Sequence, residues 1–285
     1  MRNKPNETTT GLIYLVCSPI GNLKDFTFRA VEVLKSCDLI YCEDTRNTAF
    51  LLESYGIDYK GKLYSLYSQT EVSNSLSIVK NVKDNNIVCC YLSDAGCPGI
   101  SDPGSILIKT AIENEVNVSI LPGATASVSA LVMSGFDTSN FTFRGFISPK
   151  EQAATKYLAD HLYDTSVSIY YETSKRILDF LKYLKNAGYG ERNICICKEL
   201  TKIHEEYIRG TVDELLGSDL SFIKGELVII VDKCKEEKED TEKLKEIISM
   251  LKKEDVSNKT ILKILQKYFD VNKNILYKLI LDDEK

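Results

Sequence analysis

Short apolar runs that alternate with helical patterns constrain the fold of this 285-residue chain most strongly. Each run in the first half is followed by a turn and then by apolar residues at helical spacing. The runs are Leu12–Cys17, Leu39–Cys42, Lys62–Leu66, Ile87–Leu92 and Asn117–Leu121. Repeated strand–helix units with short connections predict a parallel sheet with helices on its faces.

The pattern changes after Gly135, where fewer helical segments separate the strand-like ones. We therefore predict an α/β protein with a second α/β domain that contains a mixed sheet, plus a small helical appendage. The expected order is a disordered tail over residues 1–11, an N-terminal parallel α/β domain over 12–123, a C-terminal mixed α/β domain over 124–232, a charged linker over 233–245 and a small helical module over 246–285.

Composition narrows the class of protein. No run of 18 apolar residues occurs and the first residues lack an apolar signal core, so we expect a cytoplasmic protein that does not engage membranes. The nine cysteines show no C-x-x-C spacing, which favours free thiols over a zinc site. No metal is predicted, although a magnesium site built on Asp94 and Asp102 stays open. The net charge of −5 argues only mildly against nucleic acid and allows a local basic patch.

Four loops of unusual composition each follow a predicted strand. They read PIGN, EDTR, SDAGCPG and PGAT, at 19–22, 43–46, 93–99 and 122–125. In a parallel sheet such loops meet at one edge, where α/β proteins bind ligands. The longest stretch, Ser93–Gly104, holds three glycines, two prolines and two aspartates. We expect its Ser101-Asp102-Pro103 part to start a helix, with Asp102 as a capping residue; a tight turn with capping acids is the alternative.

Familiar nucleotide and hydrolase motifs are absent from the sequence. No G-x-G-x-x-G follows the first strand, and neither a phosphate-binding P-loop nor a G-x-S-x-G elbow occurs. What remains is an edge with glycine backbone, hydroxyls and carboxylates. That set suits a polar small molecule with a ribose and an amino-acid group.

Longer motifs carry a family resemblance. The stretches SPIGNLKDFTFRAVEVLKSCDLIYCEDTRNTAFLLESYGI, SDAGCPGISDPG, LPGATA and KELTKIHEEYIRGT, in this order within residues 12–232, resemble the ribosomal RNA small subunit methyltransferase I family. Its members are 16S rRNA (cytidine-2'-O)-methyltransferases with the tetrapyrrole methylase fold. The resemblance implies S-adenosylmethionine in a cleft between two α/β domains, usually a homodimer, and methyl transfer to a ribose 2'-hydroxyl in the decoding region of 16S rRNA within the small ribosomal subunit.

The resemblance also implies site residues. The methyl donor would contact Pro19, Ser93, Asp94, Ala95, Gly96, Asp102, Ala124, Thr125, Tyr171, Leu200 and Gly225. Cys97 stands where the family commonly has threonine. A ribose hydroxyl must lose its proton, and candidates for the base are Glu43, Asp44, Glu199 and Asp102, with Lys202 or Arg46 to polarise the hydroxyl or hold a phosphate. The EDTR cluster is preferred, although acids and bases in loops often simply pair with one another.

Two other functions fit parts of the pattern. One is a related methylase that acts on a tetrapyrrole or a protein side chain, and the other is a non-catalytic RNA-binding protein. The EDTR and ELTKIHEE blocks favour the rRNA enzyme. Arg144, Lys150, Lys175 and Arg176 are candidate phosphate contacts or solvated surface residues. The tail resembles a helix-turn-helix-like module, which either packs for stability or reads nucleic acid.

Overall fold

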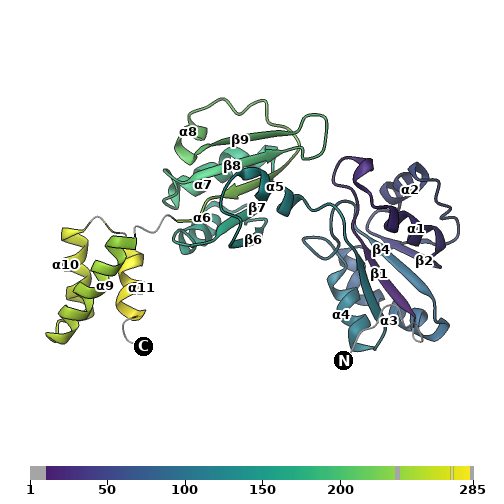
Figure 1. The fold of residues 1–285 in the computed structure, drawn as a ribbon, viewed down its shortest axis with the longest axis horizontal. Helices are drawn as coiled ribbons and strands as arrows, with labels where there is room; N and C mark the ends of the chain where they lie inside the picture. Colours follow the sequence, from purple (N-terminus) through teal and green to yellow (C-terminus); the bar gives the residue numbers. More distant parts are fainter. Residues whose placement is uncertain (1–10, 235–237, 270, 272, 283–285) are drawn as a thin grey trace.

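The protein forms two five-stranded sheets and a separate group of three helices (Figure 1). The computed structural model describes residues 11–234, 238–269, 271 and 273–282. The tail expected over residues 1–11 therefore lies, except for Gly11, outside the described residues. No helix within these ranges is long and apolar enough to cross a lipid bilayer.

The first sheet is parallel throughout, as the strand–helix alternation predicts. Its strands are β1 (Leu12–Val16), β2 (Leu39–Cys42), β3 (Leu63–Ser65), β4 (Val88–Leu92) and β5 (Asn117–Leu121). They lie in the order β3-β2-β4-β1-β5. The carboxyl ends of all five strands therefore point to the same edge.

Helices cover both faces of this sheet, which explains why its strands are apolar almost without interruption. One face packs against α1 (Phe28–Ser36), which follows the short 3₁₀ turn η1 (Leu23–Asp25), and against α2 (Thr45–Ser54). The other face packs against α3 (Ser68–Asn85) and α4 (Ser105–Glu113). The adjacent Cys89 and Cys90 point to opposite faces and are both fully buried.

The second sheet is mixed, as expected. It contains β6 (Phe141–Gly145), β7 (Val167–Thr173), β8 (Asn193–Lys198), β9 (Glu206–Thr211) and β10 (Glu226–Val231), in the order β6-β7-β10-β8-β9. Only β6 and β7 pair in parallel. One face packs on α5 (Ala126–Ser134). The other packs on α6 (Glu151–Asp160), α7 (Ile177–Asn186), which follows the 3₁₀ turn η2 (Ser174–Arg176), and α8 (Val212–Leu216).

The last helices form a module with a core of its own. They are α9 (Lys238–Lys253), α10 (Asn258–Tyr268) and α11 (Lys273–Asp282). Their core includes Leu244, Ile248, Ile261 and Leu265, all nearly inaccessible to solvent. The linker prediction for 233–245 is wrong over 238–245, because Leu244 opens the buried stripe of α9 within a run of helix-forming Lys and Glu.

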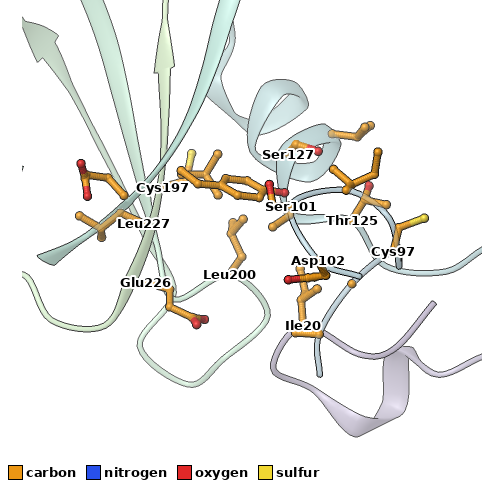
Figure 2. A pocket seen from close by; sticks show the side chains of 18 of the residues that line it. Ile20, Cys97, Ser101, Asp102, Thr125, Ser127, Cys197, Leu200, Glu226 and Leu227 are labelled. Carbon is orange, nitrogen blue, oxygen red and sulfur yellow. The ribbon is translucent and has the colours of Figure 1, made fainter. Parts of the chain in front are cut away.

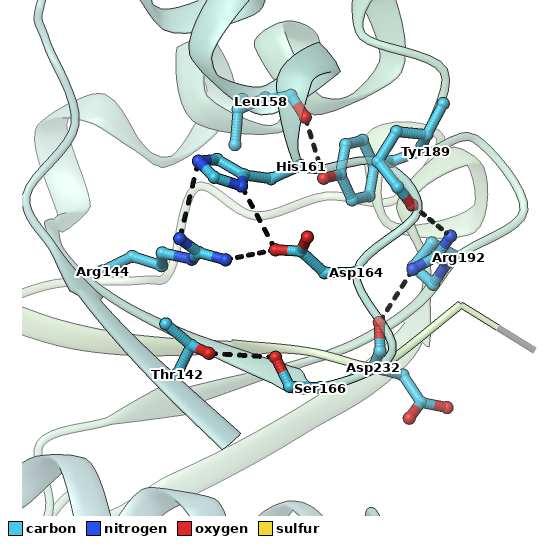
Figure 3. A network of polar contacts seen from close by, with 10 residues as sticks. Thr142, Arg144, Leu158, His161, Asp164, Ser166, Tyr189, Arg192 and Asp232 are labelled. Atoms are coloured by element: carbon cyan, nitrogen blue, oxygen red, sulfur yellow. Dashed lines mark hydrogen bonds and ion pairs between the residues drawn. The ribbon is translucent and has the colours of Figure 1, made fainter. Parts of the chain in front are cut away.

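A polar network fastens the chain where it leaves the second sheet (Figure 3). Arg192 donates to the carbonyl oxygens of Leu162 and Asp232 at 2.9 and 3.0 Å. Arg144 pairs with Asp164, whose carbonyl accepts from Cys234 N–H at 2.9 Å. These contacts fix the chain on the second domain as far as Cys234.

Candidate functional site

A cavity of about 590 Å³ lies between the two α/β domains, a size typical of small-molecule sites. Figure 2 shows Ile20, Cys97, Ser101, Asp102 and Thr125 reaching it from one side and Cys197, Leu200, Glu226 and Leu227 from the other. Loops at the carboxyl edge of the first sheet form one wall, and the ends of β7, β8 and β10 form the other. Both domains must therefore be in place for this cavity to exist.

Most of the predicted site residues line this cavity. They are Glu43, Asp94, Ala95, Gly96, Asp102, Thr125, Tyr171, Glu199, Leu200 and Lys202. The others, which are Pro19, Asp44, Arg46, Ser93, Ala124 and Gly225, are not among its lining residues. The convergence follows from the parallel sheet, because loops that follow its strands must emerge at one edge.

Ser93 acts behind the cavity wall. Its side chain is buried, and its carbonyl accepts from Ser18 Oγ at 2.9 Å. Ser18 and Gly96 also exchange two backbone hydrogen bonds of 2.8 and 3.1 Å. These bonds join the PIGN loop to the glycine-rich loop, so Ser93 and its neighbours hold the wall in shape.

Asp44 and Arg46 form hydrogen bonds and an ion pair with each other. Asp44 is the N-cap of α2: its Oδ1 accepts from Arg46 N at 2.8 Å, and its Oδ2 lies 2.6 Å from Arg46 Nη2. Hydrogen bonds from Arg46 lower the pKa of Asp44 to about 2. The Arg46 side chain is 88% exposed. This pair therefore fits a helix cap better than the catalytic cluster expected at EDTR.

Asp94 connects two of the loops. Its Oδ1 accepts from the backbone N–H of Asp44 at 3.2 Å, and its Oδ2 accepts from Asn47 Nδ2 at 2.8 Å. The carboxylate thus fixes the start of α2 against the glycine-rich loop while it also lines the cavity.

The start of α4 differs from the sequence prediction. Neither Ser101 nor Asp102 caps the helix, which begins at Ser105 after Gly104. Instead, Glu71 Oε1 on α3 accepts from the backbone N–H groups of Gly104, Ile106 and Leu107 at 2.8, 3.0 and 3.0 Å. A buried carboxylate from another helix does the capping, and this leaves Asp102 free to face the cavity.

The carboxylates on the first wall are electrostatically unbalanced. Burial, together with the charges of Glu43, Asp94 and Glu226, raises the pKa of Asp102 to about 6. Burial also raises the pKa of Glu43, and the charge of Asp94 adds to this. Within the described residues, no lysine or arginine forms an ion pair with Glu43, Asp94 or Asp102. No group of three or more metal-binding side chains is found in the same ranges.

The opposite wall is balanced by a lysine. Lys202 Nζ lies 2.9 Å from Glu199 Oε1 and 3.6 Å from Glu226 Oε2. The hydrogen bond from Lys202 lowers the pKa of Glu199. Gly225 adopts a φ of +84°, and a Cβ on it would collide with the Glu199 carboxylate. Gly225 therefore belongs to the site as the residue that leaves room for Glu199.

Several lining residues escaped the sequence analysis. The second domain adds Phe143, Phe146 and Glu226, and the first adds Ile20. Phe143 and Phe146 both pack edge-on against Tyr171, with ring centres 5.0 and 5.6 Å away. Only the pairing of β6 with β7 places these rings beside Tyr171, and the sequence does not display that pairing.

Comparison with known proteins identifies the family. Residues 12–216 match the sequence model of the tetrapyrrole (corrin/porphyrin) methylases. The chain is 42% identical to the ribosomal RNA small subunit methyltransferase I of Mesomycoplasma conjunctivae, over 80% of this chain and 94% of that protein. It is 35% identical to the protein of the same name from Streptococcus pyogenes, over 95% of each chain.

Solved structures with little sequence identity share the fold. A diphthine synthase superposes with a TM-score of 0.61 at 14% identity, over 78% of this chain and 90% of that one. A uroporphyrin-III-C-methyltransferase from Thermus thermophilus gives 0.55 at 16% identity, over 78% and 94%. The matched range, the relatives and the fold agree that this chain belongs to the ribosomal RNA small subunit methyltransferase I family, within the tetrapyrrole methylases.

Proposed function

We propose that this protein transfers a methyl group from S-adenosylmethionine to the ribose 2'-hydroxyl of a cytidine in the decoding region of 16S rRNA. The cavity and its charges support the donor, and the names of the relatives support an rRNA substrate. The observation on which the donor assignment depends is the unbalanced set of Glu43, Asp94 and Asp102 in a largely apolar cavity.

The lining residues fit the chemistry of this donor. S-adenosylmethionine supplies a methyl group on a positively charged sulfur. Unpaired carboxylates in a partly dehydrated site stabilise such a charge. Ile20, Leu200 and Val228 offer apolar surface for an adenine ring, and the Ala95–Gly96 backbone offers polar groups. The donor would also lie near Tyr171 and Thr125, whereas Pro19, Ser93, Ala124 and Gly225 would shape the site from behind its surface.

We further propose that Asp102 takes the proton of the ribose hydroxyl. As the new carbon–oxygen bond forms and the carbon–sulfur bond breaks, the hydroxyl proton passes to the Asp102 carboxylate. A base works best when its pKa is near the working pH, and a pKa of about 6 meets this requirement better than the lowered values of Asp44 and Glu199. Glu43 keeps that pKa high by its charge, and Lys202 holds Glu199 in place.

The proposed partner is 16S rRNA within the small ribosomal subunit. We propose that this protein binds it in the cytoplasm, as a homodimer. The name shared by the relatives favours this substrate over the tetrapyrroles and proteins suggested by the more distant structural neighbours. The EDTR loop still borders the cavity through Glu43, while its Arg46 extends into solvent.

The test uses purified protein, labelled S-adenosylmethionine and small ribosomal subunits that lack the modification. We expect label on the 2'-oxygen of a cytidine in the decoding region. Label on a base, or only on a porphyrin precursor, would reject the proposed substrate. Absence of donor binding in calorimetry would reject the enzyme assignment and leave an RNA-binding protein. Sedimentation measures the homodimer.

A further inference from the structure

The exposed face of α10 carries positive charge only. Lys259, Lys263 and Lys267 follow one another at intervals of four residues, so they form one stripe along the helix. Ile261 and Leu265 lie on the opposite face and are buried in the core of the module. Asn258–Tyr268 contains no aspartate or glutamate. An unbroken cationic stripe is unexpected in a chain with a net charge of −5.

These three lysines are not neutralised by the described part of the chain, where no carboxylate forms an ion pair with them. Several basic residues elsewhere are paired instead. Lys185 lies 2.8 Å from Asp213, Arg176 lies 3.0 Å from Glu172, and Arg144 pairs with Asp164. Arg144 and Arg176, which the sequence offered as phosphate contacts, are thus engaged internally. The lysines of α10 keep their charge available for a partner.

An aromatic ring extends the stripe. Tyr268 is 70% exposed, and Lys267 Nζ lies 5.4 Å from the centre of its ring. Exposed aromatic rings beside basic residues are typical of RNA-binding surfaces, because the ring stacks on an unpaired base while the lysines hold phosphates. A membrane helix would instead expose its apolar face, and the apolar face of α10 is buried.

We propose that the α10 face, defined by Lys259, Lys263, Lys267 and Tyr268, binds the backbone and an unpaired base of ribosomal RNA as a second attachment point outside the cavity. This inference rests on the proposed function, because it assumes that RNA is the substrate. The α10 face would contribute mainly electrostatic attraction, so it would raise the affinity for RNA by an amount that depends on the salt concentration.

The test measures binding of the full-length protein to naked 16S rRNA and to small ribosomal subunits at several salt concentrations. The variant is K259Q/K263Q/K267Q. The matched control, K35Q/K80Q/K156Q, removes the same charge from exposed lysines on α1, α3 and α6, for which no ion pair is found in the described part of the chain. Each phosphate contact that is lost makes the fall of log affinity with log salt less steep, by about 0.7–0.9 in the slope. For the triple variant we expect the slope to become less steep by about 2–3 and the affinity at low salt to fall at least about tenfold. The control should stay close to wild type.

Turnover separates this inference from the proposed function. With saturating subunits, kcat of K259Q/K263Q/K267Q should match wild type while KM rises. K259R/K263R/K267R should restore the affinity, and Tyr268→Ala should weaken binding with little change in salt slope. Equal binding by variant and control would overturn the inference. A loss for subunits without a loss for naked rRNA would also overturn it, because the partner would then be a ribosomal protein. A wild-type protein that binds RNA through α10 but methylates no ribose would reject only the proposed function.

Discussion

Both walls of the cavity carry carboxylates, but in the part of the chain that the structure describes only those of the second wall lie beside a lysine. On the first wall, burial and the charge of nearby carboxylates, Asp94 among them, raise the pKa values of Glu43 and Asp102. On the second wall, Lys202 lies between Glu199 and Glu226, and the pKa of Glu199 is lowered. A carboxylate with its own lysine stabilises a loop, whereas a buried one without a cation favours a positively charged ligand or a proton. This difference is the reason that the proposed chemistry uses the first wall.

The largest expected effect comes from Asp102→Asn, which removes the proposed proton acceptor. We expect kcat to fall by about 10²–10⁴, the usual contribution of a general base, with donor affinity changed only a few-fold. Single-turnover methylation and calorimetry measure the two quantities. Glu226→Gln, on the second wall, is the control and should lose much less activity. If Asp102→Asn weakened donor binding strongly but kcat at saturating donor stayed normal, Asp102 would hold the donor and another group would take the proton.

A substitution at Gly225, on the second wall, is expected to lower the stability of the fold. Gly225→Ala would force a side chain into a backbone with φ of +84° and against Glu199. We expect the free energy of unfolding to fall by about 2 kcal/mol, as measured by urea denaturation. Gly217→Ala is the matched control, because its φ is −82° and a Cβ there would meet only ordinary contacts. Equal stability of both variants would show that Glu199 can move aside without cost.

The smallest expected effect is a shift in pH dependence. Asp102 must be ionised to accept a proton, so kcat/KM should fall as the pH drops through about 6. Glu43→Gln removes a neighbouring negative charge, which should lower the pKa of Asp102 and move the midpoint of this fall to lower pH by about half a unit. Lys202→Met, on the other wall, should leave the midpoint unchanged. A midpoint that is the same in Glu43→Gln and wild type would show that the charge of Glu43 does not act on the titrating group, and this would argue against Asp102 as the base.

The sequence predicted the first wall well because sheet geometry determines where its loops meet. Asp94, Asp102 and Glu43 follow different strands of one parallel sheet, so the alternation alone brings them to one edge. The sequence also favoured Asp44 and Arg46, and the structure places Asp44 at the N-cap of α2, an ordinary position for an aspartate directly before a helix. The roles of the cavity residues remain predictions for the experiments above.

How the residues of the second wall come together could not be predicted from the sequence, because it depends on strand order. Tyr171 on β7 meets Phe146 because β6 pairs with β7, and it lies near Glu226 because β10 pairs with β7 on the other side; this strand order cannot be read from the strands themselves. The capping of α4 by Glu71 joins residues 33 positions apart with no shared motif. The helical start at Lys238 was missed because Leu244 is a single apolar residue among charges.

Glu71 has a consequence for which ligands this fold can accept. A strand, a glycine-rich loop and a helix N-terminus form the arrangement by which many nucleotide-binding proteins hold a phosphate. In this protein the free N–H groups of Gly104, Ile106 and Leu107 already surround a carboxylate of the chain itself. The anion position is permanently filled by a resident side chain. A fold region shaped for phosphate is thereby closed to it, and, among the described residues, the carboxylates of the adjoining cavity have no cation of their own on that wall.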